Sequence, residues 1–311
     1  MRHKLTQPRL SGAVILLSVA GFWGATLSFT KYALRHVGVN ELLAFRFILA
    51  ALVLVPFLPK VKRGSITLAN TLSAVVLGGV LYGIFYWQSL GLITVTTAAV
   101  GFITGTNVVM VPLITLICFR KRISHRVWVG VISTVIGLGF VAGRGIISTV
   151  SGSGLVLISA FLIAVDIVAV EKIMGSVDAL WLAFVEIVTC SALAVVFLFL
   201  GSGTGFGNFK EVTSLAVMVA VVVNGILGTA FALWAQNYYQ AIVPSAQVAV
   251  IFSTEPIFAA AIAWLFFGGT VTLNVVFGGI LVLAGVAIAD EEAFGYLVSK
   301  FLPNVDRGSS R

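Results

Sequence analysis

Long apolar blocks separated by short polar gaps run along nearly the whole chain. The blocks hold 18 to 28 residues with few charges, enough for a helix to cross a hydrocarbon core about 30 Å thick. We therefore predict an all-α integral membrane protein with ten transmembrane helices. The predicted spans are 11–33, 39–58, 68–92, 95–119, 126–143, 153–173, 179–200, 212–239, 245–267 and 271–289.

The first block follows a basic segment, MRHKLTQPRL, and so imitates a signal peptide with Ser18-Val19-Ala20 as a cleavage site. The apolar run continues through GFWGATLSF without a polar break, which makes it long enough to span. We expect an uncleaved first helix. At the other end, RGSSR resembles a cloning remnant and lies outside the predicted spans.

The two halves of the chain resemble each other. SGAVILLSVAGFWGATLSFTKYAL aligns with GSGLVLISAFLIAVDIVAVEKIM, and later segments place Pro112 opposite Pro256. Because each half holds an odd number of spans, the second half enters the membrane from the opposite side, as in many transporters. We predict two inverted five-helix repeats around a central cavity, at 1–147 and 148–290, with a cytosolic tail at 291–311.

Positive charge is distributed unevenly between the polar gaps. Of the nineteen Lys and Arg residues, fourteen fall on the side of the N-terminus, four on the other side, and Arg46 within a span. Cytosolic loops carry an excess of Lys and Arg, so both termini are predicted to lie in the cytosol. The same rule accounts for the net charge of +8 and for FRKRISHR at 119–126. We therefore expect no nucleic-acid partner.

The residues that usually carry metal or covalent chemistry are few. Cys118 and Cys190 lie within apolar blocks as small hydrophobic residues. Catalysis at membrane depth would need a nucleophile with a base, or metal ligands, and no histidine falls within a span. We expect no enzyme, no cofactor and no metal. The three histidines are His3, His36 and His125.

Glycine forms two patterns that need interpretation. GSGTGFGNF at 201–209 imitates a phosphate-binding loop, but no strand precedes it, so we interpret it as a flexible loop. Gly79-x-x-x-Gly83 and Gly101-x-x-x-Gly105 fit close helix packing.

Four ionisable side chains lie deep within predicted spans, where charges are rare and often functional. Arg46, in LLAFRFILAALVLVPF, lies about 10 Å from the outer edge, and Glu255 lies near the midplane. Asp166 and Glu186 lie nearer the cytosolic edge. A buried guanidinium needs a carboxylate or several carbonyls around it. We expect Arg46 to pair with Glu255, directly or through water, as a static clasp or as a contact that breaks on opening.

Aromatic side chains also gather near the middle of the spans. Tyr82 and Tyr86 stand one helical turn apart in the third span, and Trp234 and Tyr238 repeat that spacing in the eighth. Trp23 lies in the first span. For each ring taken alone, packing or lipid contact is the simpler interpretation.

Two prolines indicate irregular helices. Pro112 and Pro256 each free a backbone carbonyl one turn earlier, which a membrane tolerates where protein or cavity water receives it. We therefore predict that the fourth and ninth spans line a polar cavity with aromatic walls. The candidate substrate-binding or cavity-lining residues are Trp23, Arg46, Tyr82, Tyr86, Thr104, Asn107, Asp166, Trp234, Ser253 and Glu255.

FWGATLSFTKYAL, NELLAFRFILAALVLVP and LGLITVTTAAVGFITGTNVVMVPLI resemble the EamA-type branch of the drug/metabolite transporter superfamily, and the resemblance covers essentially all ten spans. It implies ten helices around a central cavity and, in bacteria, frequent export of amino acids or related metabolites across the inner membrane. The chain is most similar to the YddG-type exporters of aromatic and other neutral amino acids. Many members carry a glutamate after the fourth and ninth spans, whereas CFRKRIS and FFGGTVT contain no acid.

We expect an inner-membrane exporter of neutral amino acids, aromatic ones included, or related metabolites, working by alternating access. Arg46 would attract the carboxylate, and Glu255 or Asp166 the ammonium. A proton-coupled exporter of organic cations is the alternative, with one of these acids as the proton carrier. Phosphate-bearing solutes would call for several Lys or Arg in the cavity. The expected partners are a small-molecule substrate and the lipid bilayer, and a monomer is compatible with the sequence.

Overall fold

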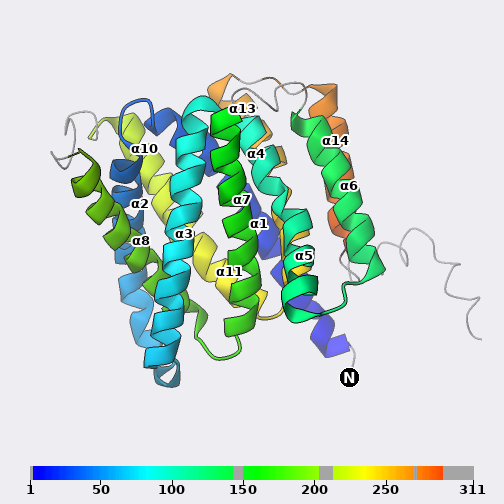
Figure 1. The fold of residues 1–311 in the computed structure, drawn as a ribbon, viewed down its shortest axis with the longest axis horizontal. Helices are drawn as coiled ribbons and strands as arrows, with labels where there is room; N and C mark the ends of the chain where they lie inside the picture. Colours follow the sequence, from blue (N-terminus) through cyan, green and yellow to red (C-terminus); the bar gives the residue numbers. More distant parts are fainter. Residues whose placement is uncertain (1–2, 143–149, 203–212, 269, 271, 290–311) are drawn as a thin grey trace, which may run out of the picture.

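The computed structural model describes residues 3–142, 150–202, 213–268, 270 and 272–289, and every regular element in these ranges is a helix. The glycine-rich segment at 201–209 lies almost entirely outside the described residues, and the tail at 291–311 lies wholly outside them. The first half forms α1 (His3–Ala33), α2 (Val39–Leu54), η1 (Val55–Lys60), η2 (Arg63–Ser65), α3 (Leu68–Thr94), α4 (Thr97–Gly105), α5 (Asn107–Phe119) and α6 (His125–Ala142). The second half forms α7 (Val150–Ile173), α8 (Ala179–Ser202), α10 (Leu215–Val222), η4 (Val223–Phe231), α11 (Ala232–Gln240), α12 (Ser245–Phe252), α13 (Glu255–Phe267) and α14 (Leu273–Ala289) (Figure 1).

The prediction of an all-helical, multi-pass membrane protein is confirmed for the described residues. Eight helical stretches are long and apolar enough to cross a membrane. The two remaining predicted spans coincide with shorter apolar helices, His125–Val141 and Leu273–Ala289. Ten spans in two inverted repeats are compatible with this arrangement and stay a prediction.

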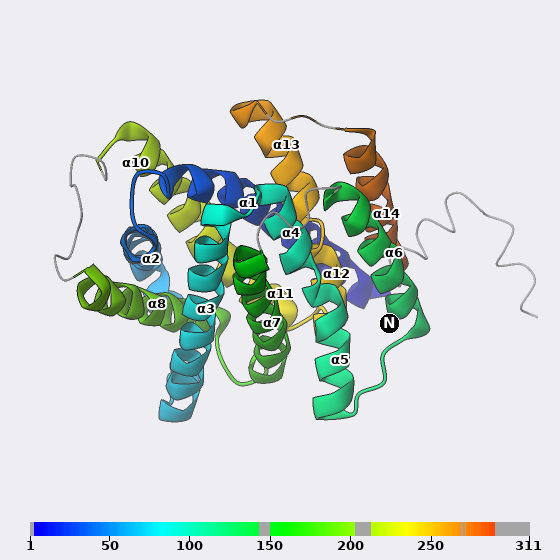
Figure 2. The ribbon, with the colours of Figure 1, turned by 45° about the horizontal axis from the view of Figure 1, so that its top comes forward.

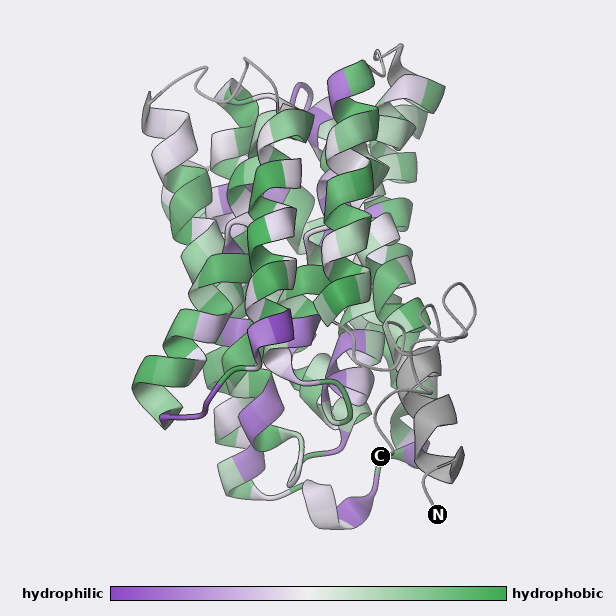
Figure 3. Ribbon diagram, turned by 90° about the vertical axis from the view of Figure 1, so that its right-hand side faces the viewer, coloured by the Kyte–Doolittle hydropathy of each residue, from purple (hydrophilic) through white to green (hydrophobic). Residues whose placement is uncertain are grey.

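The surface of the bundle is apolar around its middle. Hydrophobic residues form a band along the helices, and hydrophilic ones gather mainly at the end that holds the α2–α3 and α7–α8 connections (Figure 3). Large apolar side chains within the helices, such as Leu52, Val76 and Ile280, are 63%, 67% and 57% exposed. Such exposure is costly in water and favourable in lipid, so these side chains fit a bilayer-facing surface.

Two of the predicted spans, the fourth and the ninth, are each interrupted by a helix break. The α4–α5 break falls at Thr106, and the α12–α13 break at Ser253 and Thr254. Pro256 stands in the first turn of α13, where a proline costs no intrahelical hydrogen bond. A third irregularity was not predicted: η4 is a nine-residue π-helix between α10 and α11. The breaks place polar groups at the middle of the bundle.

The two short helices α6 and α14 pack along each other at one side of the bundle (Figures 1 and 2). Glycines make this approach possible, because a Cβ added at Gly137 would lie 2.6 Å from the carbonyl oxygen of Gly278, and one at Gly130 would lie 2.6 Å from that of Gly285. Backbones this close exclude any side chain at the crossing. The pair therefore packs as small-residue helix pairs do in membranes.

The close-packing prediction for Gly79-x-x-x-Gly83 is wrong at its first position. A Cβ at Gly79 would meet nothing within 4 Å, whereas the neighbouring Gly78 would place one 2.9 Å from the carbonyl oxygen of Glu186. The contact between α3 and α8 therefore uses Gly78. At Gly101 and Gly105 the nearest atoms belong to the side chains of Pro256 and Leu138, at 3.1 and 2.9 Å.

Candidate functional site

A small cavity lies at the centre of the bundle, where α1, α3, α7 and α11 meet the two broken helices. Its volume is about 40 Å³, which accommodates water but no larger solute. Aromatic rings of Trp23 and Phe85 form part of its wall. The polar residues that line it are Thr26, Gln88, Asn107, Asp166, Gln236 and Glu255.

Two carboxylates face this central cavity. Asp166 on α7 is 5% exposed and accepts a hydrogen bond from Nε2 of Gln236 on α11 at 3.2 Å. Glu255 is 9% exposed and is the first residue of α13, where a helix N-terminus favours negative charge. Among the described residues that line the cavity, none is Lys, Arg or His. The cavity therefore attracts positively charged groups.

Neutral polar groups complete the lining. The Asn107 side chain stands at the start of α5 and is 4% exposed, and its Oδ1 atom has no hydrogen-bond partner in the described structure. The predicted residues Thr104 and Ser253 do not line the cavity. Both hydroxyls donate to backbone carbonyls of their own helix, those of Val100 and Ala249, at 2.9 and 2.7 Å. These two residues thus shape the helix breaks.

Arg46 has partners other than the expected one. Its Nε atom donates to Oγ1 of Thr229 at 2.6 Å, and its Nη2 atom donates to the carbonyl oxygen of Gly228 at 3.0 Å. The guanidinium carbon lies 4.1 Å from the centre of the Phe85 ring. The predicted direct ion pair with Glu255 is not formed, since the salt bridge recorded over the described ranges joins Lys121 to Glu171.

The π-helix η4 provides the acceptors for this arginine. The Gly228 carbonyl also accepts a hydrogen bond from Nε1 of Trp23 at 3.0 Å, so it joins α1, α2 and η4. Thr229 accepts from Arg46 and donates to the carbonyl of Asn224 at 2.7 Å. A carbonyl and a hydroxyl oxygen therefore stabilise the buried guanidinium of Arg46. Neutral oxygen acceptors take the place of the carboxylate that was expected.

These partners of Arg46 were not predicted, although the sequence contains a signal for them. The eighth predicted span is apolar, yet it carries a run of uncharged polar residues at close spacing. Buried amides of this kind are retained when they have partners. The residues concerned are Asn224, Thr229, Gln236 and Asn237, with Gln240 directly after the predicted span, each 2% exposed or less.

Glu186 is buried but does not line the central cavity. It is 1% exposed, and its Oε2 atom accepts a hydrogen bond from Nδ2 of Asn237 at 2.9 Å. The consecutive residues Gln236 and Asn237 on α11 thus bind Asp166 and Glu186 respectively. This ties α7 and α8 to the same helix.

The aromatic side chains predicted to gather near the middle of the spans lie in separate parts of the bundle. Tyr82 stacks between Tyr86 and Phe197, with ring centres 5.6 Å apart in both cases, and its hydroxyl donates to Asn40 at 2.8 Å. It therefore links α3 to α2 and α8 and does not line the central cavity. Trp234 lines a second, larger cavity. Only Trp23 among the predicted rings faces the central one.

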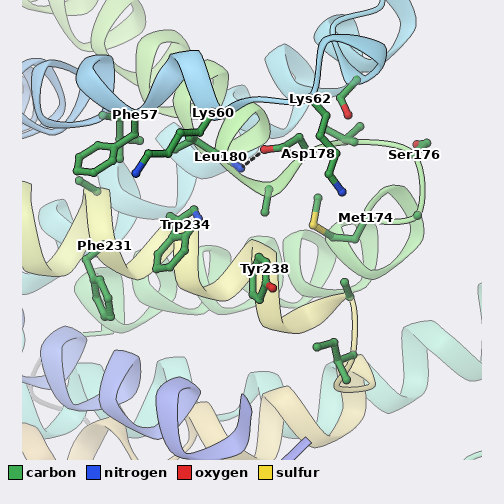
Figure 4. A pocket seen from close by; sticks show the side chains of 18 of the residues that line it. Phe57, Lys60, Lys62, Met174, Ser176, Asp178, Leu180, Phe231, Trp234 and Tyr238 are labelled. Carbon is green, nitrogen blue, oxygen red and sulfur yellow. Dashed lines mark hydrogen bonds between the residues drawn. The ribbon is translucent and has the colours of Figure 1, made fainter. Parts of the chain in front are cut away.

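The larger cavity has a volume of about 930 Å³ and lies at the end of the bundle predicted to be cytosolic. Its walls come from α2 with η1, from the α7–α8 connection, and from η4 with α11. Phe57 and Lys60 stand on one side of it, opposite Trp234 and Tyr238 (Figure 4). Because Trp234 faces this cavity and Gln236 faces the central one, α11 presents opposite faces to the two.

Comparisons with known proteins agree on a class. The sequence model of the EamA-like transporter family matches residues 10–143 and again 150–289. A protein of Archaeoglobus fulgidus named an uncharacterized transporter is 26% identical over 287 residues, covering 90% of this chain and 86% of its own length. The Bacillus subtilis uncharacterized transporters YdfC and YyaM are 21% and 22% identical, covering 92% and 89% of this chain and 92% of each relative. A crystal structure at 17% identity superposes with a TM-score of 0.71 over 92% of this chain and 99% of the other, which shows a shared fold.

Proposed function

Since this chain belongs to the EamA-like transporter family, we propose that it exports neutral amino acids, aromatic ones included, by alternating access. The family and the apolar helices make it a multi-pass membrane transporter of small molecules. The lining of the central cavity supports the choice of solute. There, two carboxylates, several amides and two aromatic walls converge at the helix breaks.

Each part of an amino acid has a partner in this cavity. Asp166 and Glu255 attract the ammonium group, and the rings of Trp23 and Phe85 contact an apolar side chain. The proposed partners of the substrate carboxylate are neutral donors in place of Arg46, namely the amide of Asn107 and the N-terminal end of α5. Half-helix N-termini are the groups that receive substrate carboxylates in other transporters with broken helices.

Alternating access follows from the size of the cavity. At about 40 Å³ it is closed to an amino acid in this conformation, so the helices around it must separate for a solute to enter. The two family matches suggest units that could move against each other. The breaks at Thr106 and at Ser253 are the natural places for the lining to change.

Organic cations are a second candidate, favoured by a specific observation. The charged groups that line the cavity within the described residues are carboxylates. A cation with an apolar body would satisfy them without any carboxylate of its own. The two candidates differ in whether the solute needs a carboxylate, which makes them separable by experiment.

Counterflow in proteoliposomes tests both. We expect labelled tryptophan to accumulate against unlabelled tryptophan or leucine inside, and tryptamine, which lacks the carboxylate, to compete poorly. If the protein takes up tryptamine and does not take up amino acids, the amino-acid proposal is overturned in favour of organic cations. Failure of both solutes would reject both candidates while leaving the family assignment intact.

Matched carboxylate variants locate the site. Asp166→Asn and Glu255→Gln should each lower tryptophan counterflow by about tenfold or more, because each removes a charge–charge contact to the ammonium. Glu186→Gln is the control, since Glu186 is equally buried but does not line the cavity. A loss confined to Glu186→Gln would place the site elsewhere.

A further inference from the structure

The larger cavity has two chemically different parts. Its interior is apolar, with Leu54, Ala230, Phe231 and Trp234 among its walls, while charged side chains stand at its rim (Figure 4). Its volume of about 930 Å³ lies at the upper end of the range of roughly 300–1,000 Å³ for pockets that bind organic molecules. Such a lining favours an amphipathic ligand over an ion or a fully polar solute.

The cavity adjoins the lipid-facing surface. Phe57 and Tyr238 both line it, yet they are 45% and 50% exposed. Tyr238 and Trp234 stand one turn apart on α11, and Tyr and Trp typically mark the membrane–water interface. These two exposed aromatic side chains are compatible with entry of a lipid acyl chain between η1 and α11.

Two lysine side chains give the rim of the larger cavity positive charge. Lys60 and Lys62 are exposed, and over the described ranges neither forms an ion pair. The Lys60 ammonium lies 5.3 Å from the centre of the Phe57 ring. Asp178 is the acid of this lining and is drawn between Lys60 and Lys62 in Figure 4; its Oδ1 atom accepts the backbone N–H of Leu180 at 2.9 Å and so caps the start of α8. Its charge is therefore directed at the helix.

We propose that this cavity binds an anionic glycerophospholipid of the cytosolic leaflet, with its phosphate at Lys60 and Lys62 and an acyl chain between α2 and α11. The cytosolic leaflet is the one rich in anionic lipids, and basic pockets between transmembrane helices on that side bind their head groups. A neutral lipid would leave the two lysines unused. A soluble phosphate would leave the apolar interior unused.

Lipid-dependent stability of the purified chain in detergent tests the head group. We expect phosphatidylglycerol to raise the melting temperature, with phosphatidylcholine and glycerol phosphate having little effect. The double variant Lys60→Gln/Lys62→Gln should need about 30-fold more phosphatidylglycerol for the same shift, from the loss of two lysine–phosphate attractions. Lys172→Gln is the control, an exposed lysine that lies outside the cavity lining and over the Phe119 ring.

The acyl chain is tested separately. Ala241 lines the cavity at an exposed position, so Ala241→Trp should obstruct the chain without disturbing the core, whereas Ala69→Trp, exposed and outside the lining, should not. Long-chain phosphatidylglycerol should lose most of its effect on Ala241→Trp. The proposal is overturned if phosphatidylcholine stabilises equally, if glycerol phosphate suffices, or if the double lysine variant responds like the unaltered chain. Transport activity does not enter this test, so its outcome is independent of the proposed substrate.

Discussion

The contacts of the Arg46 guanidinium inside the bundle include no carboxylate of the described residues. A hydroxyl, a backbone carbonyl and the face of Phe85 surround its guanidinium. Hydrogen bonds to a charged group contribute about 1.5–3 kcal/mol each, and a desolvated cation–π contact contributes about 2 kcal/mol. These contacts hold α2 against the π-helical part of the eighth span, which gives Arg46 a positioning role beside the cavity.

This geometry predicts energetic coupling between Arg46 and Thr229. Thr229→Val should lower the free energy of unfolding by about 1.5–3 kcal/mol, because it strands a buried donor of the guanidinium. In an Arg46→Leu background the same substitution should cost much less. Unfolding in SDS, measured for the two single variants and the double variant, gives the coupling energy.

Glu255 provides the contrasting cycle. Because it forms no recorded contact with Arg46, Arg46→Leu and Glu255→Gln should be additive within about 0.5 kcal/mol. If Arg46 and Glu255 were instead coupled as strongly as Arg46 and Thr229, the predicted ion pair between Arg46 and Glu255 through water would be supported.

At the scale of elements, two glycine-based contacts allow neighbouring helices to pack closely within the bundle. The π-helix η4 carries Gly228, where an added Cβ would meet the side chain of Thr26 on α1. The α6–α14 pair uses facing glycines whose added Cβ atoms would meet backbone oxygens. Both follow from the need for close contact where apolar lipid gives helices no hydrophobic reason to associate.

The α6–α14 pair supports a prediction with an internal control. Gly137→Ala should destabilise the protein by about 1–3 kcal/mol, because its Cβ would lie 2.6 Å from the Gly278 carbonyl oxygen and force the helices apart. Gly139→Ala, two residues along the same helix, should be neutral, since nothing lies within 4 Å. Melting temperatures in detergent measure both, and equal effects would count against the glycine contact.

At the scale of the whole molecule, the larger cavity, the α7–α8 connection and the hydrophilic end of the bundle coincide (Figures 1 and 3). The charge count assigns this end to the cytosol. An even number of spans places both termini on the same side of the membrane. A test of the side on which the C-terminus lies therefore tests the ten spans and the orientation together.

Reporter fusions measure this topology. Green fluorescent protein at the C-terminus should be fluorescent, because it fails to fold after ordinary export, and alkaline phosphatase at the same place should be inactive. Alkaline phosphatase fused after residue 36, in the predicted outer loop, is the control and should be active. A dark fluorescent fusion paired with an active C-terminal phosphatase would refute the orientation.

Much of this molecule could be predicted from local composition. Apolar blocks give helices wherever backbone groups must be satisfied within lipid, so the spans agree with the described helices. Pro256 indicated the break before α13, whereas the break predicted at Pro112 is wrong, because Pro112 lies inside α5 and the fourth span is interrupted earlier, at Thr106. The central cavity at those breaks was likewise predicted, together with Trp23, Asn107, Asp166 and Glu255 in its lining. These features depend on depth along a helix, which counting residues gives directly.

The remaining features depend on which face of a helix meets which neighbour. Arg46 and Glu255 match in depth, but the rotation of α2 aims the guanidinium at Thr229 and Gly228. Trp234 and Gln236 are two residues apart and face different cavities, because about 100° per residue turns their side chains to opposite sides of α11. The sequence by itself therefore determined the apolar helices long enough to span a membrane and the internal duplication. Only the tertiary structure decided their partners, since hydrophobicity specifies burial in lipid without specifying the rotation and neighbours of each helix.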